Sequence, residues 1–232
     1  MPTLWIGNKN YSSWSMRPWL LMRHAGIAFE EKRLRLFSAG FARDIARVSP
    51  AGRVPVLVDE GFAVWDSLAI AEYLAERFPE HRLWPQDARE RATARAVCAE
   101  MHAGFSALRA KFPMNVEAHL PHLHHLFHDP ALQHDVGRIV AMWTELRARH
   151  GARGPFLFGE FSVADAFYAP VVMRFRTYEP PLPAPVTEYM VTMLALPALR
   201  EWIEAACAER EFLPQDEPYR TQGDEPLFAP QA

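Results

Sequence analysis

The sequence is poor in cysteine, in long apolar runs and in excess charge of either sign. Only Cys98 and Cys207 occur among its 232 residues, far apart and without a C-x-x-C pair, so we expect two reduced thiols rather than a disulfide. No apolar run approaches the length of a membrane span. The 25 basic and 28 acidic residues are well mixed, which argues against the basic stripe of a nucleic-acid-binding protein.

The first residues also lack the basic region, apolar segment and cleavage site of a secretion signal. Together with the cysteine content, this predicts a cytoplasmic protein without a membrane partner. The chain is rich in proline instead, and its 20 prolines cluster at 79–85, 113–130, 180–185 and 214–230. Such clusters separate helices rather than mark low complexity. The length fits one large domain or two modest ones.

The first eighty residues alternate strand and helix signals. Apolar or alternating runs predict strands at 4–7, 29–36, 54–59 and 62–65. Helical spacing predicts helices at 15–24, 41–48 and 68–77. The order β-α-β-α-β-β-α places a parallel crossover before an antiparallel hairpin at Glu60-Gly61. We therefore predict an α/β domain of thioredoxin-like layout over residues 1–78.

The rest of the chain shows no convincing strand. Residues 79–86 are predicted to be a linker, and residues 87–232 to form an all-α helical bundle. In that domain, residues 161–165 (FSVAD) match a helix-capping box, and the segment after Pro214 is an extension that is strapped or loose. Helices are predicted at 87–110, 131–150, 161–175, 187–195 and 197–210.

Histidines gather in or beside the proline-rich connection at 113–130. Their spacing matches no common ligand motif and no cysteine set accompanies them, so we predict no metal site. These histidines are His119, His122, His124, His125, His128 and His134.

A serine-rich loop at residues 11–19 (YSSWSMRPW) lies where the first predicted strand gives way to the first helix. Hydroxyls at such a junction lie beside the exposed N–H groups of the helix start, where an anion can be held. The same serines could simply cap the helix. The loop alone leaves both interpretations open.

Four segments, in order, resemble the glutathione transferase family, specifically a bacterial member of zeta-like serine type. Residues 12–17 (SSWSMR) resemble the zeta-class serine motif, and residues 49–57 (SPAGRVPVL) resemble the family segment whose second proline is cis. Residues 66–74 (DSLAIAEYL) resemble its acid-Ser-x-Ala-Ile helix start, and 161–165 with Pro170 resemble the capping box of its C-terminal domain. The resemblance covers nearly the whole chain. It implies a homodimeric enzyme with glutathione as co-substrate.

The resemblance makes Ser12 the hydroxyl that stabilises the glutathione thiolate. A thiol with a pKa near ~8.5 is mostly protonated at pH 7, so one hydrogen bond that favours the anion matters. Tyr11 is the rival, because other transferase classes use a tyrosine near this place. Ser13 is assigned to glutathione binding or to capping.

Glutathione itself is expected to bind beside two further segments. A cis Val54-Pro55 bond would expose the Val54 backbone to an extended peptide, which pairs as an added strand. The helix start at Ser67 offers N–H groups and a hydroxyl to the γ-glutamyl carboxylate, and Asp66 could take the ammonium group. An ordinary N-cap is the alternative for this pair. Arg53 could bind the glycyl carboxylate or a backbone carbonyl.

The electrophile site is expected between the serine loop and the second domain. His102, Phe105 and Arg109 would share one face of the predicted helix 87–110, either walling that site or forming an interface. Trp14 stands where zeta enzymes carry a cysteine, which weakens the transfer of their maleylacetoacetate isomerase activity. Arg17 matches the motif arginine or forms a surface salt bridge.

We predict a glutathione transferase that adds the glutathione thiolate to an electrophilic small molecule. One alternative is a glutathione-dependent cis–trans isomerase, similar to maleylacetoacetate isomerase. A further alternative is a non-catalytic, transferase-like module that binds a partner protein.

Overall fold

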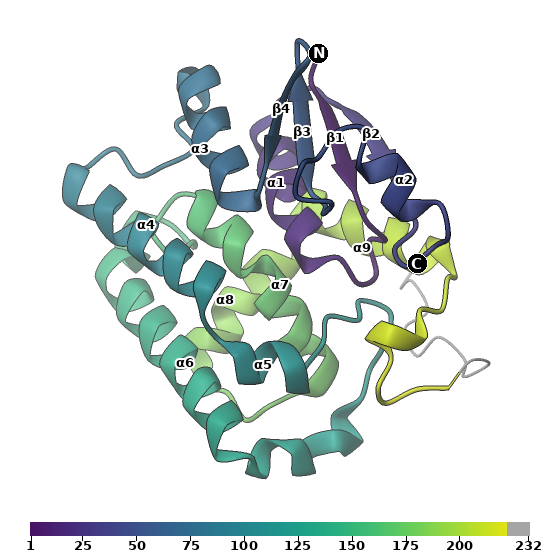
Figure 1. The fold of residues 1–232 in the computed structure, drawn as a ribbon. Helices are drawn as coiled ribbons and strands as arrows, with labels where there is room; N and C mark the ends of the chain where they lie inside the picture. The colour runs from purple at the N-terminus through teal and green to yellow at the C-terminus, as the bar shows by residue number, and fades with distance from the viewer. Residues whose placement is uncertain (222–232) are drawn as a thin grey trace.

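A four-stranded mixed sheet organises the first part of the computed structural model, which describes residues 1–221 (Figure 1). Its strands are β1 (Thr3–Ile6), β2 (Glu30–Arg33), β3 (Val56–Asp59) and β4 (Phe62–Trp65), in the order β2-β1-β3-β4. β1 runs parallel to β2 and antiparallel to β3, which pairs antiparallel with β4. The predicted crossover and hairpin are therefore confirmed.

Two helices connect these strands, α1 (Ser13–Ala25) and α2 (Phe41–Ile45), and α3 (Ser67–Arg77) follows β4. The predicted order β-α-β-α-β-β-α is thus confirmed. α1 ends at Gly26, whose φ of 73° is the left-handed cap that glycine adopts without steric penalty. β2 is shorter than the predicted strand and forms one edge of the sheet. All four of its residues are charged and exposed.

The remaining described elements are helical. They are α4 (Ala88–Ala103), α5 (Ser106–Lys111), α6 (Pro130–His150), α7 (Val163–Tyr178), α8 (Ala184–Leu194) and α9 (Pro197–Glu209). A 3₁₀ helix at Pro121–His128 lies within the proline-rich connection. A thioredoxin-like domain followed by a helical domain is therefore the observed fold.

The prediction of one helix over residues 87–110 is wrong. Asp87 caps the helix as expected, but the chain leaves it at Gly104, which is extended, and Phe105 takes a left-handed φ of 57°. α5 then begins in a new direction, and the side chain of Asp135 in α6 accepts the Leu108 N–H. This contact comes from a distant part of the chain, so local spacing could not anticipate the break.

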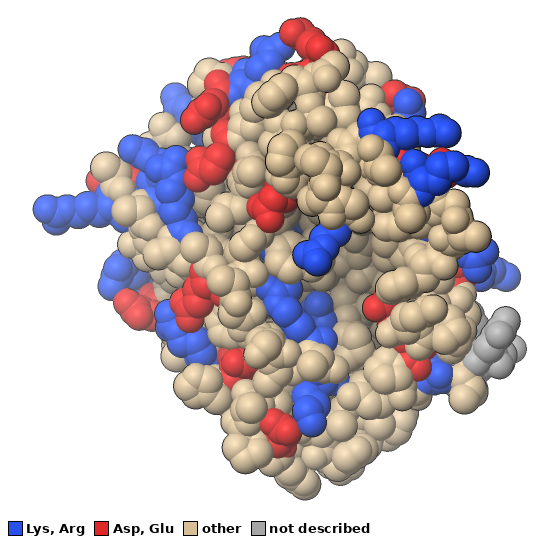
Figure 2. Space-filling view, viewed as in Figure 1, with Lys and Arg blue, Asp and Glu red and all other residues tan. Residues whose placement is uncertain are grey.

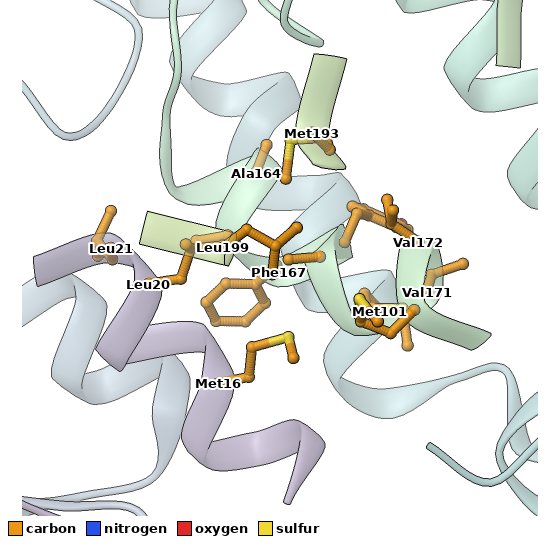
Figure 3. Packing of buried hydrophobic residues seen from close by; sticks show 14 of the residues in the cluster. Met16, Leu20, Leu21, Met101, Ala164, Phe167, Val171, Val172, Met193 and Leu199 are labelled. Carbon is orange, nitrogen blue, oxygen red and sulfur yellow. The ribbon is translucent and has the colours of Figure 1, made fainter. Parts of the chain in front are cut away.

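The main core joins the two domains. The start of α7 is fixed by the predicted capping box, in which Ser162 and Asp165 bond each other's backbone N–H groups. Figure 3 shows Phe167 of α7 directed towards Met16 and Leu20 of α1. All three side chains are buried. Because α1 packs directly on α7, the serine loop at its start is held against the helical domain.

The C-terminal segment folds back onto the serine loop. Trp202 of α9 donates its indole N–H to the Lys9 carbonyl at 3.0 Å, and the segment then turns through a 3₁₀ helix at Pro214–Asp216. As far as residue 221, the predicted extension is strapped onto the molecule. Its residues 222–232 lie outside the described residues.

Two predictions from composition can be compared with the structure. Cys98 is buried, Cys207 is half-buried, and both thiols are free, as expected. None of the helices in the described part of the chain is both long and apolar enough to cross a membrane.

Candidate active site

A pocket of about 360 Å³ opens where the start of α1 meets the helical domain. It brings together residues that lie far apart in the sequence. The sequence-predicted residues among its walls are Tyr11, Ser12, Ser13, Trp14, Arg53, Val54 and Arg109. Figure 2 shows basic side chains gathered in the hollow at the centre of this face, between the sheet and the C-terminal helices.

Ser12 occupies the N-cap of α1 and also lines the pocket. Its Oγ lies 2.7 Å from Ser15 Oγ and accepts the Ser15 backbone N–H at 3.4 Å. Ser15 is fully buried and its Oγ accepts the Gly7 backbone N–H at 3.0 Å. Ser12 therefore caps the helix and also faces the pocket, so capping does not exclude a role in holding an anion.

Tyr11 also lines the pocket, but its hydroxyl is engaged elsewhere. It donates to Glu217 Oε1 at 2.7 Å and also lies 3.0 Å from the Glu211 carbonyl. Burial and the Glu217 carboxylate together raise the pKa of Tyr11 far above its ordinary value. The phenol proton is thus held by the C-terminal segment rather than offered to the pocket.

The loop before β3 forms the wall opposite the helical domain. The Val54-Pro55 peptide bond is cis, as the resemblance implies. Val54 lies before the paired register of β3, which begins at Val56 opposite Trp5, so its backbone stands outside the ladder. Arg53 is exposed at the pocket rim.

Asp66 and Ser67 lie at the start of α3, outside the lining of the pocket. Asp66 caps this helix, accepting the N–H groups of Leu68 and Ala69, with a φ of 77°. Ser67 is buried and its Oγ accepts a hydrogen bond from Arg17 at 3.3 Å.

The surface-salt-bridge alternative for Arg17 is wrong. This side chain is 1% exposed, and its guanidinium lies 4.3 Å from the Trp14 ring centroid and 4.7 Å from that of Phe167. Burial, and then the charge of Arg109, lower the pKa of Arg17 to about 9. Its position inside the core follows from the packing of α1 on α7.

The predicted shared helix face for His102, Phe105 and Arg109 is also wrong, because the chain breaks between α4 and α5. Arg109 still lines the pocket, with its guanidinium 4.8 Å from the Trp14 ring centroid. His102 contacts the edge of that ring, and its Nε2 lies 3.2 Å from Asp66 Oδ2. Phe105 is buried in the core.

Sequence reasoning missed several walls of the pocket. Arg174 comes from α7, where a charged residue after a long apolar stretch was the available signal. The others arrive from loops and short elements, and of these only Gly52 belongs to a motif named above, the segment 49–57. They are Leu36, Phe37, Phe41, Gly52, Pro113, Met114 and Asp216.

A metal centre finds no support in this geometry. Within residues 1–221, no group of three or more histidine, cysteine, aspartate or glutamate side chains is placed to hold a metal ion. The pocket lining offers the hydroxyls of Ser12 and Ser13 at the start of α1, together with arginines.

The fold and the serine pocket define a two-domain protein of thioredoxin-like type. Two family models match the chain: the N-terminal domain of glutathione S-transferase over residues 11–77 and its C-terminal domain over residues 129–205. The chain belongs to the glutathione S-transferase family.

Individual relatives agree with this assignment. A probable maleylacetoacetate isomerase of Caenorhabditis elegans is 33% identical over 107 residues, 46% of this chain and 49% of that protein. The chain thus spans about half the length of such relatives. A zeta-class glutathione S-transferase of Euphorbia esula is 25% identical over 214 residues, 90% of this chain and 89% of that protein.

The fold has solved counterparts. A glutathione transferase homolog from Burkholderia, solved with bound glutathione, is 24% identical and superimposes with a TM-score of 0.68. The superposition covers 89% of this chain and 98% of that one. At this identity the likeness concerns the fold.

Proposed function

We propose that this protein is a glutathione transferase in which the glutathione thiolate attacks an electrophilic small molecule. The observation that carries the proposal is the pocket itself, whose lining includes both Ser12, the N-cap of α1, and Val54. Family membership and the glutathione bound in the Burkholderia homolog support glutathione as the co-substrate.

Ser12 is proposed to stabilise the thiolate through a short relay. Hydroxyl protons rotate to suit their partners. With sulfur in the pocket, Ser12 donates to it, Ser15 donates to Ser12 Oγ, and the Gly7 N–H donates to Ser15 Oγ. Linked donors polarise one another, and the N-terminus of α1 adds a favourable field. Lowering the thiol pKa by about two units takes roughly 2.7 kcal/mol, which this arrangement can supply.

The peptide is proposed to lie along the loop before β3. Val54 would pair with it as an added strand, and Arg53 would meet the glycyl carboxylate at the rim. Ser67 Oγ accepts from Arg17, so its own proton can be donated to the γ-glutamyl carboxylate. Asp66 would take the ammonium group, and Ser13 would support the loop.

Further properties of the family are proposed for this chain. These are a homodimer, a cytoplasmic location that suits two free thiols, and a domain division at residues 79–86. The electrophile would meet the thiolate beside Trp14.

A glutathione-dependent isomerase is the second candidate, favoured by the name of the nematode relative. In that reaction the thiolate adds to a double bond and leaves again. Turnover of maleylacetone without net loss of glutathione would favour it over conjugation.

The experiment that tests the proposed function is calorimetric titration of the purified protein with glutathione, with oxidised glutathione in parallel. Saturable binding of the thiol, together with thiolate absorbance of the complex at pH 7, supports the proposal. Failure to bind glutathione would overturn it and favour the non-catalytic module that binds a partner protein.

A further inference from the structure

Three arginines from three helices converge behind the serine loop. Arg17 belongs to α1, Arg109 to α5 and Arg174 to α7. Arg109 and Arg174 line the pocket, whereas Arg17 is not part of its lining and has its guanidinium 4.3 Å from the Trp14 ring centroid. Burial lowers the pKa of Arg17 to about 9 and that of Arg174 to about 10, and the nearby charge of Arg109 is the second cause of both shifts.

These cations are bonded only to neutral groups within residues 1–221. Arg174 donates to the Phe112 carbonyl and, at 3.3 Å, to Ser13 Oγ. Arg109 donates to carbonyl oxygens at the end of α4, including that of Gly104 at 3.1 Å. No carboxylate forms an ion pair with any of the three in this part of the chain. Other arginines there, such as Arg23, Arg33, Arg95 and Arg138, are each paired with a glutamate.

Donor groups also remain unused there. Nε of Arg174 and both Nε and one terminal nitrogen of Arg17 are buried without a hydrogen-bond partner among the described residues. Buried charges are normally paired, because removing them from water is costly. Asp216 is the one acid in the pocket lining, and it lies near Arg174 without forming an ion pair within residues 1–221. Burial lowers the pKa of Arg109, a shift that the nearby charge of Asp135 in α6 opposes, again without an ion pair within residues 1–221. The pocket lining therefore has more arginines than acids.

These arginines lie on the side of the pocket where the electrophile, rather than the glutathione peptide, is proposed to bind. Val54 and Arg53 form the sheet side of the pocket, where an extended peptide pairs. Arg109 and Arg174 come from the helical side, and Arg174 is bonded to Ser13, the neighbour of Ser12. An anion held by this pair would lie beside the sulfur that Ser12 stabilises. The flat ring of Trp14, on which Arg109 stacks, adds an apolar wall to the same place.

We propose that the acceptor half of the pocket binds electrophiles that carry a carboxylate, held by Arg109 and Arg174. The inference rests on the proposed function and names its class of substrate. Guanidinium groups suit carboxylates because they offer parallel N–H donors. For an aryl halide, a C–S bond forms and the C–Cl bond breaks. Chloride leaves with the bonding electrons, and the thiol proton passes to solvent.

A matched pair of probes tests this inference: 4-chloro-3,5-dinitrobenzoate and the corresponding neutral benzamide. For each, kcat/KM with glutathione is divided by the rate constant of the uncatalysed reaction, which removes the intrinsic difference in reactivity. We expect the normalised value to favour the benzoate by about tenfold or more, the effect of one charge-assisted hydrogen bond.

Arg109→Met should lower that preference about tenfold, and Arg109→Lys should retain part of it because the charge stays. Arg138→Met is the control, since Arg138 lies on α6 in an exposed pair with Glu100, and it should keep the full preference. If the methionine variant does not fold, Arg109→Lys tests the inference in its place. Loss of the guanidinium fork alone should lower the preference for the benzoate measurably.

The outcomes separate the inference from the function on which it rests. Turnover of both probes without preference for the benzoate overturns the inference and leaves the transferase intact. An Arg109→Met variant that loses glutathione affinity but keeps the preference places Arg109 in the peptide site and also overturns it. Absence of both glutathione binding and turnover would remove the proposed function itself.

Discussion

The role proposed for Ser12 adds thiolate stabilisation to the capping that the structure shows. As N-cap it fixes the start of α1, and as a pocket wall it can donate to a thiolate. Ser12→Ala should raise the pKa of bound glutathione by about one to two units, because the donor that favours the anion is gone. Turnover at pH 7 should then fall about 10- to 100-fold. The pKa is measured from thiolate absorbance of the complex against pH.

The affinity of the Ser12 variant for glutathione is the internal control. It should change far less than turnover, because the proposed peptide contacts lie on the sheet side. An unchanged thiol pKa, with activity lost instead in Tyr11→Phe, would transfer the role to Tyr11.

Tyr11 is expected to act on stability through the C-terminal segment. Its hydroxyl and Asn115 both donate to the buried Glu217 carboxylate. Tyr11→Phe removes one of these donors, so the free energy of unfolding should fall by about 1–3 kcal/mol. Denaturant unfolding of the variant and the wild-type protein measures this loss. A variant as stable as the wild type, with a raised thiol pKa, would contradict the assignment.

At the scale of elements, the break between α4 and α5 determines where Arg109 lies. A Cβ at Gly104 would approach the Glu100 backbone oxygen to 2.9 Å, and the Gly104 carbonyl accepts from Arg109. Gly104→Ala should therefore destabilise the protein by about 1–3 kcal/mol, the usual range when local geometry is forced to shift. Thermal and denaturant unfolding check the value.

The chain supplies a matched control for that substitution. Gly137 lies inside α6 with open space where its Cβ would be. Gly137→Ala should stabilise the protein by about 0.5–1 kcal/mol, because alanine loses less conformational freedom in a helix. If both alanines stabilised the protein, the backbone contact at Gly104 would be unimportant.

The elements that the sequence predicts well are those with local causes. The hairpin at Glu60-Gly61, the Gly26 cap and the Ser162–Asp165 capping box each depend on neighbours within a few residues. The break at Gly104 depends on Asp135, 27 residues from the Leu108 that it bonds, and so escapes local spacing.

The same distinction applies to the candidate site. Most pocket residues found in advance belong to the serine motif or to the segment before β3, whereas Arg174 and Met114 arrive by packing of the helical domain. The burial of Arg17 could not be foreseen either. It depends on packing against Phe167, which lies in α7 about 150 residues further along the chain.

At the scale of the whole molecule, the candidate site exists only where the two domains dock. One wall comes from the sheet domain and the other from α5 and α7, while the C-terminal segment closes the edge at Asp216. His102 and Asp66 add a polar contact between α4 and the start of α3. Pocket shape therefore depends on domain packing as well as on the serine motif. The boundaries at residues 78 and 86 stay a prediction.

The proposed homodimer has a candidate surface on the sheet edge formed by β4. Phe62 and Trp65 are 62% and 46% exposed on this strand, an unusual position for two large aromatic side chains. Burial of such anchors in an interface typically contributes 2 kcal/mol or more each, about 30-fold in the dissociation constant. Phe62→Lys should therefore shift a dimer towards monomer in sedimentation velocity over a range of protein concentrations.

Val191→Lys provides the control for this test, because Val191 is 67% exposed on α8, away from the sheet edge. It should leave the dimer unchanged. Loss of the dimer in the Phe62 variant alone would identify the β4 edge as the contact between copies. Loss in the Val191 variant alone would place that contact on the helical domain. The exposed aromatics of β4 would then need another partner.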